Sequence, residues 1–209
     1  DSNMGVLTSR TVSNDSFLTG QSWERIQDPS VIWEKSVAVV QELLREYPDV
    51  TAMGLSGQMH GILYLDAVGT PVSPLYIWQD GRGDLPYDET HSWAAHLSEL
   101  TGYSLATGYG LVTHCCNLNH GLVPKNAVKL CTIHDYLAMK FSGRSIPVTE
   151  ATDAASLGLY DGPNHRFDPE ALQKAGIDPT ILPEVVTDPC LGTGMLGIPV
   201  YAALGDNQA

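Results

Sequence analysis

The sequence contains few basic residues and no long apolar run. Eleven Lys and Arg stand against 24 Asp and Glu, so the formal net charge at pH 7 is -13. This balance argues against nucleic acid as a partner, because contacts to phosphates need clustered Lys and Arg. The sequence contains no run of about 18 apolar residues, the length needed to cross a bilayer. Its first residues also lack the pattern of a secretory signal peptide. We therefore expect neither a nucleic-acid nor a membrane partner.

Two common catalytic motifs are also missing. The sequence has no G-x-x-x-x-G-K-[ST] segment, which excludes a Walker-type phosphate loop. The segment Gly54-Leu55-Ser56-Gly57 begins like a G-x-S-x-G nucleophile elbow, but Gln58 stands where the motif requires its second glycine. We therefore interpret Ser56 as a turn residue and not as a nucleophile.

Cysteine is scarce, and its spacing is not that of a disulfide framework or a metal site. The cysteines show no C-x-x-C spacing and two are adjacent, which suits reduced thiols and favours a cytoplasmic setting. Cys116 and His120 form one i,i+4 pair without a third ligand at metal spacing, so a helix with packed thiols is favoured over a zinc site. The four cysteines and the two histidines near them in sequence are His114, Cys115, Cys116, His120, Cys131 and Cys190.

The length of 209 residues suggests one large domain or two small ones, and a hydrophobic content of 43% is enough to bury a core. The chain begins at Asp1 without an initiator Met and stops directly after Gly205-Asp206-Asn207-Gln208-Ala209. We interpret both ends as cuts through a longer protein. The sequence sets no oligomeric state and leaves a homodimer open.

Apolar periodicity predicts helices and strands in alternation. Residues 1–27 are polar and could hold one or two edge strands. Asp28 and Pro29 are typical of a helix start, and apolar residues from Trp33 to Tyr47 recur at helical spacing until Pro48. Further helices are predicted over 88–100, 112–122, 133–141 and 168–176, and strands over 50–55, 62–65, 75–77 and 200–204, with a hairpin loop at 66–71. This alternation favours an α/β architecture with a mixed sheet.

Three polar stretches follow apolar segments, where an open α/β sheet places its ligand crevice. They are Gly54 to Gly61, Trp78 to Arg82 and Gly205 to Ala209. Each has an ordinary explanation when taken alone. His60 would be a structural histidine, Trp78 a core residue, Asp80 with Arg82 a surface ion pair, and Asp206 an ordinary carboxylate. Their combination in this order is what points to a site.

This combination resembles the sugar-binding half of the FGGY carbohydrate kinases, a family with an actin-like, ribonuclease H-like fold. The matching motifs are Gly57-Gln58-Met59-His60-Gly61, Trp78-Gln79-Asp80-Gly81-Arg82 and Gly205-Asp206-Asn207-Gln208-Ala209. The resemblance runs from about Asp28 to the last residue. It implies that residues 1–209 are an N-terminal sugar-binding domain without the family's first phosphate hairpin and without the C-terminal nucleotide domain. A fragment of this kind is expected to be inactive alone.

The resemblance also implies a mechanism and a set of site residues. ATP would phosphorylate a primary hydroxyl of a ketose, and Asp206 would act as the general base. Mg²⁺ would arrive with ATP, held by phosphates and water, so no metal site is expected in this half. The substrate-binding candidates are Gln58, Met59, His60, Trp78, Asp80, Arg82, Tyr109, Asn207 and Gln208.

Within the family, the chain is most similar to the sedoheptulokinases. This similarity rests on Trp78 to Arg82, Ala106 to Gly110, Thr132 to Tyr136 and the Asp153 to Ser156 segment. Xylulokinases share the Gly-Gln-Met-His-Gly turn, so a xylulokinase or another FGGY sugar or polyol kinase stays open as the alternative. A sugar-binding module without kinase activity is the second alternative, although it would have no need of a base at Asp206.

Overall fold

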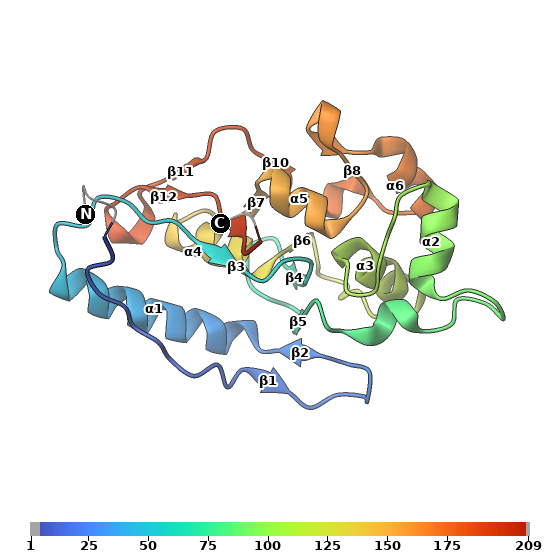
Figure 1. Cartoon of the computed structure of the whole chain (residues 1–209), viewed down its shortest axis with the longest axis horizontal. Coiled ribbons are helices and arrows are strands. Elements are labelled where there is room, and N and C mark those ends of the chain that lie inside the picture. Colours follow the sequence, from blue (N-terminus) through green and yellow to red (C-terminus); the bar gives the residue numbers. More distant parts are fainter. Residues whose placement is uncertain (1–4, 208–209) are drawn as a thin grey trace.

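Helices and short strands alternate along residues 5–207, the part of the chain that the computed structural model describes (Figure 1). The helices are α1 (Pro29–Glu46), α2 (Trp93–Thr101), α3 (Gly110–Asn119), α4 (Ile133–Phe141), α5 (Ala151–Leu157) and α6 (Pro169–Ala175). The strands are β1 (Phe17–Leu18), β2 (Ile26–Gln27), β3 (Ser56–Gly57), β4 (Leu63–Leu65), β5 (Leu75–Tyr76), β6 (Lys129–Cys131), β7 (Val148–Thr149), β8 (Tyr160–Asp161), β9 (Arg166–Phe167), β10 (Glu184–Val185), β11 (Cys190–Gly192), β12 (Val200–Tyr201) and β13 (Leu204–Gly205).

The strands pair in both directions, as the predicted mixed sheet requires. β2 lies between β1 and β5 in an antiparallel set, and β4 pairs with β6 in the same sense. β3 pairs with β13, and β7 with β10, in parallel. Single bridges extend these pairs: Ile62 meets Tyr76 beside β4 and β5, and Met53 meets Val200 ahead of β3.

The apolar run at 62–65 is buried on both faces, which explains why it shows no polar alternation. Ile62 and Tyr64 pack into a cluster with α2, α3 and α6. Leu63 and Leu65 point the other way, into a cluster with α4 and α1. Because neighbouring residues of a strand face opposite sides, this one segment joins the two parts of the core. Among the described residues, the helices are all too short or too polar to span a bilayer.

Local capping chemistry gives several helix ends as predicted. The Asp28 carboxylate accepts a hydrogen bond from the Ser30 backbone N–H, with Pro29 at the first position of α1. Thr132 caps α4, which covers the predicted 133–141. Asp168 caps α6, and Gly176 ends it with φ of 69°, in the left-handed region.

Two predicted boundaries are wrong. α2 begins at Trp93 and not near Asp88, because the Asp88 carboxylate accepts the backbone N–H groups of Thr90 and His91 and closes a turn there. The helix predicted at 112–122 runs instead over α3, which ends at Asn119.

The strand predicted over 50–55 is also wrong, since the segment forms only a single bridge at Met53 and one backbone hydrogen bond at Leu55, whose carbonyl accepts from Leu204, before β3 begins. The predicted strand at 200–204 is divided into β12 and β13. α5 was not predicted at all, because its seven residues are too few to show a helical apolar period. The loop at 66–71 agrees with prediction, and of the one or two edge strands expected within residues 1–27, β1 lies at the edge of its sheet while β2 lies inside it.

Candidate functional site

The parallel pairing of β3 with β13 brings two of the predicted motifs together. Leu204 lies opposite Ser56 and Gly205 opposite Gly57, and the backbone N–H of Asp206 donates to the Gly57 carbonyl at 2.9 Å. Asp206 therefore follows the end of β13 at the point where the Gly57–Gly61 turn leaves β3. Its side chain is exposed. Asn207 is also exposed, and Gln208 lies outside the described residues.

At two positions of the turn, neighbouring atoms leave no room for a side chain, so only glycine fits. A Cβ on Gly57 would lie 2.8 Å from His134 Nδ1, and a Cβ on Gly61 would lie 2.7 Å from the Tyr76 carbonyl oxygen. Both distances are far inside van der Waals contact. The glycines thus let the turn pass close to α4 and β5.

His60 is held in an unusual backbone conformation by α5. Its φ is 72°, in the left-handed region that non-glycine residues rarely occupy. The backbone N–H of His60 donates to Ser156 Oγ at 3.2 Å, and His60 Nδ1 lies 2.6 Å from the Ser156 carbonyl oxygen. The ring stacks on Tyr109, with centroids 4.6 Å apart and planes 10° from parallel. His60 and Tyr109, both predicted site residues, are therefore neighbours.

Gln58 and Trp78 line a cavity of about 400 Å³ beside the same turn. Gln58 Nε2 donates to Gln27 Oε1 at 3.0 Å, which ties the turn to β2. Trp78 is 51% exposed, so its ring is available to a ligand and is not a core residue. Met59, by contrast, is buried and points into the protein.

Asp80 and Arg82 form a buried ion pair, which makes the surface-pair interpretation wrong. Asp80 is fully buried and Arg82 is 1% exposed. Arg82 Nε donates to Asp80 Oδ1 at 2.6 Å, and the backbone N–H of Arg25 donates to Asp80 Oδ2 at 3.0 Å. Arg82 also contacts Asn117 and lies over the Tyr76 ring, 4.1 Å from its centroid. The pair joins β2, β5 and α3 behind the site.

A second buried ionic group, which the sequence did not reveal as functional, lies beside Gly57. His134 Nε2 contacts Asp153 Oδ2, and Asp135 is buried next to them. Burial first, and then the neighbouring Asp153 charge, raise the pKa of Asp135 to about 8. Burial opposes protonation of His134, but its hydrogen bond to Asp153, with the charges of Asp135 and Asp206, raises its pKa above the usual value.

These features escape sequence reasoning for identifiable reasons. His134 and Asp153 are 19 positions apart and meet only when α4 and α5 pack. Ser156 acts partly through its backbone carbonyl, which has no side-chain signature. The available signal in the sequence was the resemblance of Thr132 to Tyr136 and of Asp153 to Ser156 to segments of the sedoheptulokinases.

The cysteine-bearing helix has the expected packing. Cys115 and Cys116 are buried, and burial raises the pKa of Cys115 to about 12 and that of Cys116 to about 11. His120 Nδ1 lies 2.8 Å from the Cys116 carbonyl oxygen of its own helix. All four cysteines, which lie within the described residues, are free thiols. Within residues 5–207, no cluster of three or more His, Cys, Asp or Glu side chains could hold a metal ion.

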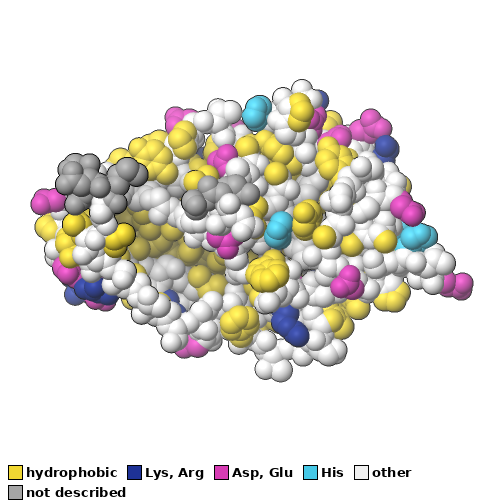
Figure 2. All heavy atoms as spheres, in the orientation of Figure 1, with side chains coloured by type: hydrophobic (Ala, Val, Ile, Leu, Met, Phe, Trp, Pro, Cys, Tyr) yellow, Lys and Arg dark blue, Asp and Glu magenta, His cyan; other side chains and the backbone are white. Residues whose placement is uncertain are grey.

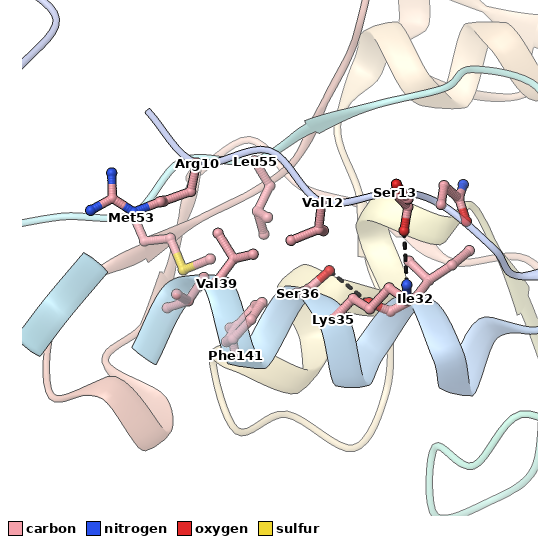
Figure 3. Close-up of a pocket in the computed structure, with 12 residues that line it drawn as sticks. Arg10, Val12, Ser13, Ile32, Lys35, Ser36, Val39, Met53, Leu55 and Phe141 are labelled. Carbon is pink, nitrogen blue, oxygen red and sulfur yellow. Dashed lines mark hydrogen bonds between the residues drawn. The ribbon is translucent and has the colours of Figure 1, made fainter. Parts of the chain in front are cut away.

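A separate groove of about 360 Å³ lies between the N-terminal segment and α1 (Figure 3). Val12, Val39, Met53, Leu55 and Phe141 make it largely apolar. Figure 2 shows apolar side chains at the floor of a hollow on this side of the molecule, above α1. None of the described residues predicted for the site lines this groove.

Comparisons with known proteins show the family of the chain. Residues 1–209 match the model of the N-terminal domain of the FGGY family of carbohydrate kinases. The chain is 27% identical over 186 residues to a xylulose kinase of Staphylococcus xylosus, covering 87% of this chain and 38% of the relative. It is 30% identical over 202 residues to a glycerol kinase of Brucella ovis, covering 87% of this chain and 40% of the relative.

Solved structures share the fold. A glycerol kinase of Plasmodium falciparum with ADP superposes with a TM-score of 0.81 at 17% identity, covering 100% of this chain and 45% of that one. This likeness confirms the predicted actin-like, ribonuclease H-like fold. The chain thus spans about two fifths of the length of the curated relatives it matches. On the match along its whole length, the chain belongs to the FGGY family of carbohydrate kinases as an N-terminal domain.

Proposed function

We propose that this chain is the sugar-binding domain of a kinase that transfers the γ-phosphoryl group of ATP to a hydroxyl of a small ketose or polyol. The observation that carries this proposal is the parallel pairing of β13 with β3. It supports a role for Asp206 as general base, since the residue follows β13 directly beside the turn that carries Gln58 and His60.

The proposed reaction needs little covalent chemistry from the protein. The substrate hydroxyl oxygen forms a bond to the γ-phosphorus, the bond between that phosphorus and the bridging oxygen of ADP breaks, and the hydroxyl proton passes to the Asp206 carboxylate. Bound ATP would supply the phosphoryl group, and Mg²⁺ held by its phosphates and by water would neutralise the phosphate charge. The exposed position of Asp206 suits contact with a substrate.

The remaining site residues have proposed roles in holding the sugar. Gln58, which lines the cavity, is proposed to offer hydrogen bonds, and the half-exposed Trp78 beside it an apolar wall to the carbon skeleton. His60, two residues along the same turn, is proposed to offer a further hydrogen bond. Tyr109 backs the His60 ring. Asp80 and Arg82, being buried, are proposed to support this wall from behind. Asn207 and Gln208 orient Asp206 or reach the sugar, and Met59 contributes through its backbone.

The substrate is proposed to be a ketose with a primary hydroxyl, and sedoheptulose, giving sedoheptulose 7-phosphate, is the first candidate. D-Xylulose is an equal alternative, since the relatives include xylulose and glycerol kinases. We further propose a cytoplasmic protein whose remaining length supplies the nucleotide domain. On that basis residues 1–209 alone bind sugar without turning it over.

The test is ADP release by the intact protein with sedoheptulose, D-xylulose and glycerol in parallel. A preference for sedoheptulose supports the first candidate, and a preference for either other compound keeps the mechanism while replacing the substrate. Saturable sugar binding without ADP release from any sugar or polyol would favour the binding-module alternative and overturn the kinase proposal.

A further inference from the structure

The contact between His60 and α5 determines which ring nitrogen carries the proton. His60 Nδ1 lies 2.6 Å from the Ser156 carbonyl oxygen, a hydrogen-bond distance. A carbonyl oxygen can only accept, so Nδ1 must be the donor. A neutral imidazole has one donor and one acceptor, which leaves Nε2 with a free lone pair. His60 therefore presents an acceptor, and not a donor, on the side of the ring away from α5.

The Ser156 carbonyl is available for this bond because of its place in the helix. α5 ends at Leu157, and the last four carbonyl groups of a helix have no partner within it. His60 Nδ1–H satisfies one of these groups. The bond thus serves both partners, which explains why the left-handed backbone of His60 persists despite its cost.

The Ser156 hydroxyl is oriented in a matching way. Its Oγ–H donates to the Asp153 carbonyl oxygen at 2.8 Å, so its lone pairs are left to accept the His60 backbone N–H at 3.2 Å. Rotating the His60 ring by half a turn would place a carbon against the Ser156 carbonyl and lose the 2.6 Å bond. Because the ring stacks on Tyr109, its plane is the same in both of these ring orientations. Both the backbone and the ring of His60 are therefore anchored by one residue.

We propose that Ser156 is a positioning residue that holds His60 as the Nδ1–H tautomer, and that His60 Nε2 thereby selects substrates that donate a hydroxyl proton at this point. A substrate carbonyl or carboxylate in the same place has no proton to donate, and its oxygen is repelled by the lone pair of Nε2. The site then favours neutral sugars and polyols over sugar acids. This inference deepens the proposed function and rests on it for the identity of the ligand.

The tautomer can be measured without any substrate. In the ¹⁵N-labelled intact protein, two-bond ¹⁵N–¹H correlations of the imidazoles distinguish a protonated Nδ1 from a protonated Nε2, and His60→Asn assigns the His60 signals by their loss. The expected pattern is protonated Nδ1 with unprotonated Nε2. Protonated Nε2 with unprotonated Nδ1 would overturn the inference, whatever the protein's activity turns out to be.

Kinetics of variants test the role in recognition. Ser156→Ala removes the Oγ that accepts the His60 backbone N–H while keeping the carbonyl that accepts from Nδ1, so it tests the anchoring of the backbone alone. We expect KM for the sugar to rise about tenfold with kcat within twofold, as for one lost hydrogen bond, and an unchanged KM would show that the hydroxyl does not position His60. Ser98→Ala is the matched control. Ser98 Oγ donates to the Ala94 carbonyl and accepts the Leu105 N–H, but it lies on α2 away from the turn, so KM should not change.

His60→Asn separates the bond to Ser156 from the proposed acceptor Nε2. Asn tolerates positive φ and can donate to the Ser156 carbonyl, but it has no atom equivalent to Nε2. We expect KM for the sugar to rise about 10- to 100-fold. With a series of monodeoxy analogues, one analogue should be used equally well by His60→Asn and the wild type, which identifies the hydroxyl that Nε2 accepts. A constant ratio across the whole series would overturn the assignment of Nε2 as the acceptor.

Discussion

Two groups of charged side chains are buried within residues 5–207, and they differ in how many of their polar atoms have hydrogen-bond partners. Asp80 and Arg82 neutralise each other, and the Arg25 backbone N–H, the Asn117 side chain and the Glu24 carboxylate complete their hydrogen bonds. Beside Gly57, His134 and Asp153 also form a pair, but His134 Nδ1 and Asp153 Oδ1 are buried without a hydrogen-bond partner among the described residues.

The difference separates a structural role from one linked to the site. The polar side-chain atoms of Asp80 and Arg82 all have partners, so we expect this pair to contribute to stability and to the proposed support of Trp78. The His134 group keeps unused polar capacity, lies against the turn at Gly57, and is influenced by the charge of Asp206. Changes in the first group should therefore affect folding, and changes near the second should affect the turn or the pH response.

The largest effect on stability is expected at Arg82. Arg82→Met leaves Asp80 buried without its counter-charge, which should lower the free energy of unfolding by about 3–5 kcal/mol. Denaturant unfolding of the intact protein measures this. Arg166→Met is the control, because Arg166 is exposed and its loss should change stability by no more than about 0.5 kcal/mol. Equal effects of the two variants would contradict the structural role of the pair.

An intermediate effect is expected at Gly57. Gly57→Ala forces a methyl group against the His134 ring, which should cost about 1–3 kcal/mol and displace the Asp206 segment hydrogen-bonded to Gly57. Both unfolding and sugar turnover should therefore suffer. Gly54→Ala, where a Cβ meets nothing within 4 Å, serves as the control. If Gly57→Ala keeps wild-type turnover, the turn is not as closely fitted as the structure indicates.

The smallest effect at neutral pH is expected at Asp135. Burial and Asp153 raise the pKa of Asp135 to about 8 in the folded protein, so its carboxyl is mostly protonated at pH 6 and Asp135→Asn should change stability by less than about 1 kcal/mol there. The folded state then holds a proton that the unfolded state releases, and stability falls as pH rises from about 4 to about 8. Asn cannot titrate, so unfolding curves of the variant should depend less on pH over this window. An unchanged pH slope would show that Asp135 is not the titrating group.

Sequence reasoning succeeded where the chemistry is local. Asp28 and Asp168 predict helix starts because their side chains accept hydrogen bonds from backbone N–H groups in the first turn of the helix. The neighbourhood of Asp206 and the Gly57–Gly61 turn followed from motif order, and parallel pairing of their strands accounts for it physically.

Sequence reasoning failed where the outcome depends on packing between distant elements. The burial of Asp80 and Arg82 depends on β2 and α3 closing over them, which no local pattern reveals. The anchoring of His60 depends on a carbonyl at the end of α5, a helix too short for its period to be recognised. The strand expected at 50–55 has the right composition but makes backbone hydrogen bonds to a neighbouring segment only at Met53 and Leu55, which is too little for a regular strand.

The most direct test of the central claim is Asp206→Asn in the intact protein, with sugar-dependent ADP release and sugar affinity measured together. Loss of the proposed base should lower kcat by about 10²- to 10⁴-fold while the sugar Kd stays within a few fold. Asp49→Asn, at an exposed carboxylate away from the turn, should change neither quantity. Retained turnover, or loss of sugar binding in step with turnover, would contradict the role of Asp206 as general base.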